Sequence, residues 1–155
     1  MIKATRAELN AAFGAFSRIF EETKLGADLT WRVSRIINEL KKHAKDYSRF
    51  EQKLYKDAGG VSSPNGGLML QALTKQGEKE SVAEFEQRFQ TYREKLNGLS
   101  DALDARMDEE VEVEVKPIPV SLLPKKRKNE KNEDQDVEFR ATDFAACGPF
   151  LVEKE

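Results

Sequence analysis

The side chains that most often carry out chemistry are sparse and scattered in this chain. It contains one histidine, His43, and one cysteine, Cys147. A lone imidazole can act as a pH-sensitive group or a ligand, but His43 falls between Leu40 and Tyr47 on a helical apolar face. A packed interface residue is the more common role there. Without a second histidine or cysteine to complete a zinc site, the sequence predicts no metal site and no cofactor.

Known catalytic motifs are also missing from the sequence. The glycine pairs at 59–60 and 66–67 lack the Lys and Ser/Thr that follow in a phosphate-binding loop, and no nucleophile elbow or His-Glu-x-x-His is present. The carboxylates between 108 and 114 alternate with valines, which is typical of the solvated face of a strand rather than a cation site. We therefore expect no catalytic residues and a protein that is not an enzyme.

A short basic cluster is the one local feature that suggests phosphate binding. It consists of Lys125, Lys126, Arg127 and Lys128. Acidic residues follow directly and cancel much of its field, so we expect a mobile charged loop over 125–136 rather than a nucleic-acid site. The whole chain has 26 basic and 28 acidic residues, and its net charge of −2 does not steer it toward nucleic acid or anionic membrane.

Three helices would position these residues. Thr5 and Glu8 form a capping box that opens a helix over 5–22, and we attribute Gly14 in its interior to close approach of another helix. Asp28 is a plausible N-cap for a second helix over 28–57, roughly 30 residues and about 45 Å long. Ser81 and Glu84 form a second capping box, which opens a third helix over 81–107 that continues through Asn97 and Gly98.

The second and third helices carry matching apolar stripes. Their spacing of three and four residues lines one side of each helix, so we expect a long antiparallel, coiled-coil-like hairpin packed with the first helix. We expect Trp31, near the start of the second helix, to be buried. The two stripes are Val33, Ile36, Leu40, Tyr47, Phe50 and Leu54, and Val82, Phe85, Phe89, Tyr92, Leu96, Leu99 and Leu103.

Segment 58–80 forms the tip of this hairpin, because it is rich in glycine, serine and proline. Its apolar residues either pair as a small β-hairpin around Asn65 and Gly66 or belong to an irregular loop. In either case they lie far from the main core, so they either pack onto the helical rod or bind a partner, and we take partner binding as the leading interpretation. These partner-binding residues are Val61, Leu68, Met69, Leu70 and Leu73.

The carboxy-terminal part, 110–155, changes to a period of two. Val111, Val113 and Val115 alternate with glutamates and predict a strand, which we expect to pair with residues 137–140 in an antiparallel ribbon closed by 125–136. Thr142 or Asp143 then caps a short final helix. The predicted fold class is thus mainly α with a small antiparallel β element.

Composition supports one domain over 1–155, with 39% hydrophobic residues. The amino-terminal residues lack the apolar core of a signal peptide, and no stretch is long enough to span a membrane. A single cysteine fits a reducing compartment. We expect a soluble protein that is not secreted by a signal peptide and has no role in a membrane.

The ordered pattern resembles a family of small, mostly uncharacterised helical-hairpin proteins encoded by tailed bacteriophages. The resemblance covers most of the chain, although segment 125–136 and Pro149 depart from the pattern. It implies a phage protein that acts by contact, in the host cytoplasm or in the virion, and it supplies no catalytic residues. The matching segments read WRVSRIINELKKHAKDYSRFEQKLYK, LDARMDEEVEVEV and FRATDFAACGPFLV.

The leading interpretation is a non-enzymatic protein-binding protein, either virion-associated or an assembly factor. The alternative is a small inhibitor that binds a host enzyme or defence protein. Nucleic-acid binding through 125–128 ranks third. The apolar stripes are either satisfied within one chain or shared between copies, so a homo-oligomer stays open.

Overall fold

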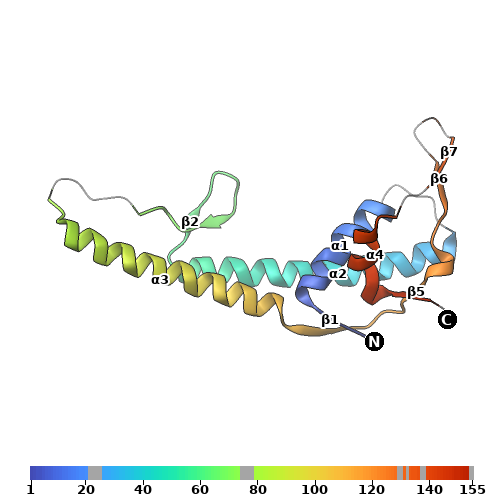
Figure 1. Ribbon diagram of the computed structural model, residues 1–155, viewed down its shortest axis with the longest axis horizontal. Helices are drawn as coiled ribbons and strands as arrows, with labels where there is room; N and C mark the ends of the chain where they lie inside the picture. The colour runs from blue at the N-terminus through green and yellow to red at the C-terminus, as the bar shows by residue number, and fades with distance from the viewer. Residues whose placement is uncertain (21–25, 74–78, 129–130, 132, 137–138, 154–155) are drawn as a thin grey trace. The chain divides into compact units, whose positions relative to one another are not determined.

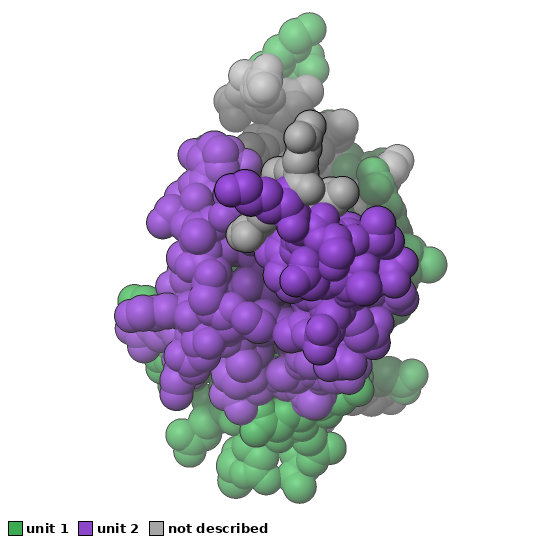
Figure 2. All heavy atoms as spheres, turned by 90° about the vertical axis from the view of Figure 1, so that its left-hand side faces the viewer, with its two compact units in different colours: residues 1–45, 108–155 green, residues 46–107 purple. Residues whose placement is uncertain are grey.

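The computed structural model describes residues 1–20, 26–73, 79–128, 131, 133–136 and 139–153. It is mainly helical with small strand pairs, which confirms the predicted fold class at this level. The chain divides into two compact units, residues 1–45 with 108–155 and residues 46–107 (Figure 2). This differs from the single domain predicted from composition. The boundary falls inside helix α2 (Ala27–Asp57), so one continuous helix contributes to both units.

Unit 1, residues 1–45 and 108–155, contains the main hydrophobic core. Helix α1 (Arg6–Phe20) packs beside α4 (Ala141–Cys147), as Figure 1 shows. Phe16 is fully buried and meets the ring of Phe150 edge to face, with 5.9 Å between ring centroids. Burial of each such side chain contributes about 1.5–3 kcal/mol. Helix α2 adds Leu29, Val33, Ile36 and Leu40 to the same core.

The apolar face of α2 is therefore used differently from the prediction. We expected residues 33–54 to pack along the third helix as one stripe. Instead, the stripe from Leu29 to Leu40 belongs to a core cluster whose described members come from unit 1 alone. Helix α3 (Val82–Met107) lies wholly in unit 2.

Strand β4 (Glu110–Val113) forms as predicted, but its partner is strand β1 (Ile2–Thr5), which the sequence analysis missed. The pair is antiparallel, with Ile2 opposite Val113. Both side chains are buried, while Glu110 and Glu112 face solvent near Lys3. We expected β4 to pair with 137–140; its partner is β1, Phe139 and Arg140 are not in a strand, and 137–138 lie outside the described residues.

The charged segment 125–136 is a second correction. Strands β6 (Lys126–Lys128) and β7 (Asp134–Asp136) pair antiparallel within the segment that we predicted to be a mobile loop. Lys126 lies opposite Asp136 in this pair. Opposite charges on neighbouring strands attract, which gives the ribbon a physical reason to form. Nearby, β5 (Ile118–Pro119) and β8 (Leu151–Val152) pair in parallel, next to short 3₁₀ helices at Val120–Leu122 and Gly148–Phe150.

Helix α4 begins two or three residues before the position that we predicted. Arg140 is the N-cap residue, rather than Thr142 or Asp143. Asp143 instead occupies the third helical position, where its carboxylate accepts the backbone N–H of Arg140 at 2.8 Å. The same carboxylate forms an ion pair with Arg18 of α1. Asp143 is buried, and its bonds to Arg140 and Arg18 connect the start of α4 to α1.

Unit 2, residues 46–107, contains the end of α2, a short β-hairpin and α3 (Figure 1). Strands β2 (Val61–Ser62) and β3 (Leu68–Met69) pair antiparallel around Asn65 and Gly66, which selects the hairpin over the irregular loop. Helix α3 runs without a break through Asn97 and Gly98, as predicted. Both predicted capping boxes are confirmed, with Thr5 and Glu8 and with Ser81 and Glu84 bonded reciprocally.

Two side-chain environments contradict the sequence analysis. Gly14 is exposed, and an added Cβ there would meet nothing within 4 Å, so no close helix approach requires it. Trp31 is 54% exposed rather than buried. It lies two residues from Leu29 and from Val33, and two residues correspond to about 200° around a helix. This spacing places Trp31 on the opposite face from the core stripe.

Substitution of Gly14 should stabilise the protein. Glycine in a helix interior costs roughly 0.5–1 kcal/mol relative to alanine, and the site has room for the methyl group. We expect Gly14→Ala to raise the free energy of unfolding by that amount, measured by urea denaturation followed by circular dichroism. Ala11→Gly, at an exposed position of the same helix, should lower it by a similar amount. A destabilising Gly14→Ala would contradict the open environment.

The Asp143 contact should make stability depend on pH. Burial raises the pKa of Asp143, but hydrogen bonds from Arg18 and from the Arg140 backbone outweigh it, and the pKa lies below its ordinary value. The stabilisation is therefore complete above the unfolded pKa of about 3.9 and is lost as pH falls through the folded pKa.

We expect Asp143→Asn to lower the free energy of unfolding by about 1–3 kcal/mol at neutral pH, since a buried charged hydrogen bond is lost. The difference from the wild type should stay constant down to about pH 5 and shrink below about pH 4. Glu112→Gln is the control, because its ion pair with Lys3 is exposed and worth at most about 1 kcal/mol. A difference that grows toward acid pH would refute this role for Asp143.

Candidate functional site

Three of the predicted partner-binding residues, Val61, Leu68 and Met69, lie in the β2–β3 hairpin. Val61 lies opposite Met69 in the strand pair, and each is 43% exposed. The remaining members, Leu68 in β3 and Leu70 and Leu73 after it, are half-buried. The hairpin therefore presents one exposed apolar pair rather than the five-residue cluster expected from sequence.

Turn chemistry explains why this hairpin forms. Gly66 has a φ of +83°, which a residue with a side chain rarely adopts. The backbone N–H of Ser63 donates to Gly67 O at 2.7 Å, and the N–H of Asn65 donates to Ser63 Oγ at 3.1 Å. At the base, a Cβ on Gly60 would lie 2.7 Å from the Tyr55 carbonyl oxygen. Only glycine fits there without a shift of the backbone.

A longer apolar surface lies on the first half of α3. Val82 is 66% exposed, Phe89 42% and Leu96 38%. They are spaced by seven residues and so lie on one side of the helix. Phe85 and Tyr92 fall between them on the same side and are half-buried, and the rings of Phe85 and Phe89 stack at 6.1 Å. We call these five residues the α3 stripe.

Contacts with the end of α2 begin where the α3 stripe ends. Lys95 Nζ donates to the carbonyl oxygen of Ala58, one residue beyond α2, at 3.0 Å. Further along α3, the Arg106 guanidinium lies 5.1 Å from the centroid of the Phe50 ring. Leu99, between these two contacts, is buried. Residues 82–94 precede both contacts, which accounts for the exposure of Val82 and Phe89, whereas Leu96 is exposed directly after the Lys95 contact.

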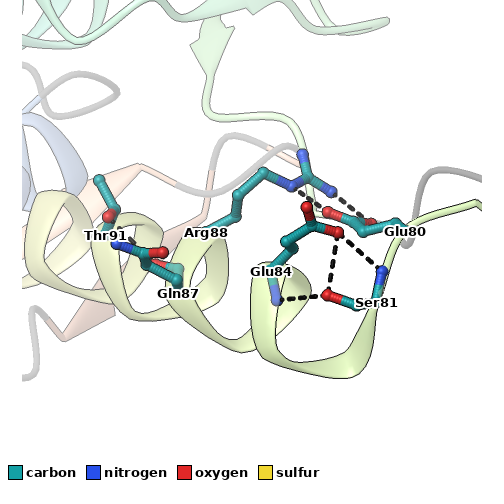
Figure 3. A network of polar contacts seen from close by, with 6 residues as sticks. All are labelled: Glu80, Ser81, Glu84, Gln87, Arg88 and Thr91. Atoms are coloured by element: carbon teal, nitrogen blue, oxygen red, sulfur yellow. Dashed lines mark hydrogen bonds and ion pairs between the residues drawn. The ribbon is translucent and has the colours of Figure 1, made fainter.

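The start of α3 is held by a local polar network, shown in Figure 3. The Arg88 guanidinium points back toward Glu80 and donates from Nε to its carboxylate at 2.6 Å. Glu84 accepts from the backbone N–H and the hydroxyl of Ser81, and these bonds lower the pKa of its carboxyl group. The bonds between Ser81 and Glu84 satisfy backbone N–H groups at the start of α3. They stabilise the first turn of the helix that carries the α3 stripe.

The other predicted candidates do not form a chemical site. Cys147 is buried, and burial, with a smaller contribution from Asp143, raises the pKa of its thiol to about 12. The thiol is therefore protonated at neutral pH and is a poor nucleophile. His43 is half-buried on α2. In the part of the chain that the structure describes, no group of three or more metal-binding side chains is found.

The basic cluster is spread over a turn and a strand. Lys125 and Lys126 are exposed, and Arg127 and Lys128 follow in β6. The partner strand β7 brings Asp136 opposite Lys126 in the register of the pair. Acidic residues therefore accompany the basic ones in space as well as in sequence, which weakens the field available to a phosphate.

The chain matches no protein-family model, no curated protein and no solved structure. Its function must therefore be argued from its own surfaces. None of the described helices is long and apolar enough to cross a membrane.

If the α3 stripe does not pack against another part of the chain, shortening its side chains should lower the free energy of unfolding only slightly. We expect Phe89→Ala to change the free energy of unfolding by less than about 1 kcal/mol, because its ring is 42% exposed. Leu99→Ala, on the same helix but buried, should cost about 2–5 kcal/mol. Urea denaturation of both variants measures the contrast. Equal losses would show that Phe89 is part of the core.

Proposed function

We propose that this protein acts by binding another protein through unit 2, without a catalytic activity of its own. The α3 stripe is the observation that carries the proposal. Isolated exposed apolar residues are common on protein surfaces and need no explanation. Full burial of a large apolar side chain contributes about 1.5–3 kcal/mol, and because these side chains are only partly buried, a partner that covers the row would gain the remaining part of that energy.

The contacts between α2 and α3 support an antiparallel helical hairpin in unit 2. Phe50 of α2 meets Arg106 of α3, and Ala58, eight residues later, meets Lys95, eleven residues earlier. Residue numbers therefore rise along one helix as they fall along the other. In this arrangement the end of α2 lies along α3 from Lys95 onward, and Val82, Phe89 and Leu96 stay exposed for a partner.

A helix is the partner shape that fits this surface best. Val82, Phe89 and Leu96 are the anchors of a heptad pattern, into which a second amphipathic helix packs its own apolar side chains. The exposed pair Val61 and Met69 on the β-hairpin adds a second apolar contact within the same unit. Both surfaces lie on ordered elements, which reduces the entropy lost on binding.

The resemblance to tailed-phage proteins supports a narrower proposal, a virion-associated protein or an assembly factor. Under this proposal the partner is another component of the particle. A host enzyme as the partner, bound at fixed stoichiometry, would favour the inhibitor instead. Capture from infected cells, followed by mass spectrometry, separates these two identities.

The proposal is tested by replacing the three exposed anchors together. Val82→Ser/Phe89→Ser/Leu96→Ser should reduce capture of the principal partner at least tenfold while the helical circular dichroism is retained. The matched control is Ala83→Ser/Gln90→Ser/Asn97→Ser, which shifts the same heptad by one residue to exposed positions. The control should capture the partner like the wild type.

Two results would overturn the assignment. Undiminished capture by the anchor variant would show that the α3 stripe is not the binding surface. A turnover activity that survives the loss of every partner would contradict a purely binding role.

A further inference from the structure

A second surface, in unit 1, surrounds the exposed Trp31. A pocket of about 200 Å³ opens beside this ring, between α2 and the chain that follows β4. Val115 forms part of its apolar wall and is itself buried. The largest apolar side chain of the protein thus lines a concave surface and leaves 54% of its area in solvent. Exposed tryptophans of this kind are enriched at the centres of binding sites.

The charges around the pocket are predominantly positive. The Arg35 guanidinium stacks 5.1 Å from the centroid of the Trp31 ring. Lys116 lines the same pocket, and within the described residues neither of these two cations forms an ion pair. Arg32 is already bonded to Asp28 at 3.1 Å. Glu114 is the carboxylate in the lining, so the pocket carries a net positive charge.

The size and charge of the pocket narrow its ligand class. Sites for drug-sized molecules and cofactors usually have roughly 300–1,000 Å³, so this one fits a single side chain. A nucleic-acid strand needs a track of cations along its backbone. Here the neighbouring strand β4 presents Glu110 and Glu112 to solvent, so the cations of the pocket do not continue as a track along that strand.

We propose that the Trp31 pocket binds a short acidic peptide segment of a partner protein. An apolar side chain of the peptide packs on the indole ring, and an adjacent carboxylate pairs with Arg35 and Lys116. A guanidinium can stack on an aromatic face and donate from its edge to a carboxylate at the same time, so the Trp31 contact need not break. This site belongs to unit 1 and does not depend on the α3 stripe.

The experiment uses the fact that Trp31 is the only tryptophan in the chain. Its single indole N–H signal in a ¹⁵N-correlated NMR spectrum of the full chain reports the pocket directly. The probes are acetyl-Leu-Asp-amide and its uncharged counterpart acetyl-Leu-Asn-amide, titrated into the millimolar range. We expect saturable shifts with both, and at least threefold tighter binding of the aspartate peptide.

The variants Arg35→Gln and Lys116→Gln should each bring the ratio of the two affinities closer to one. Lys41→Gln, at an exposed position of α2 in the same unit, should leave the ratio unchanged. Equal affinities in the wild type, or no saturable shift, would overturn the proposal. So would tighter, salt-dependent binding of oligothymidylate, since it would assign the pocket to nucleic acid. Capture by the α3-stripe variant tests the proposal for unit 2 alone, and the peptide titration tests the Trp31 pocket alone. Either proposal can therefore be refuted without the other.

Discussion

The apolar face of helix α2 is the constraint on which the rest of the structure depends. A helix of 31 residues has one continuous stripe, but its two halves serve different units. Leu29, Val33, Ile36 and Leu40 are buried in the core of unit 1. Tyr47, Phe50 and Leu54 are half-buried in unit 2. Because the first half is committed to that core, α3 has only the second half available as an intrachain partner.

This division explains why α3 is only partly covered. Its apolar rhythm continues for seven positions, from Val82 to Leu103, and of these only Leu99 is buried. The available length of α2 ends near Lys95, where the Ala58 carbonyl accepts the lysine side chain. Helix α3 is therefore longer than the part of α2 that belongs to unit 2, and it keeps an apolar surface that folding does not use. Such a surface is a reason to look for binding rather than for catalysis.

Local signals were predicted well from sequence, and pairings between distant segments were not. The capping boxes at Thr5 and Ser81 depend on residues three apart, and both form as expected. Strand β4 was recognised from alternation, but its partner β1 lies more than a hundred residues away and is only four residues long. A strand of that length has too little pattern to be distinguished from the start of α1. Periodicity also identified the seven apolar positions of α3 without showing that three of them, Val82, Phe89 and Leu96, are exposed.

The same limit applies to the charged residues of the candidate binding sites, because the sequence does not show which charges the fold brings together. The sequence suggested phosphate binding at Lys125–Lys128, because these four basic residues are consecutive. The fold gives that segment an acidic partner strand, with Asp136 opposite Lys126. Arg35 and Lys116 are far apart in sequence and were not singled out, yet both line the Trp31 pocket. The exposure of Trp31 could have been predicted from sequence, because Trp31 lies on the opposite side of the helix from Leu29 and Val33. The presence of Lys116 in the same pocket is seen only in the structure. In a chain with almost no net charge, the cations available to a ligand are those that the fold leaves outside ion pairs.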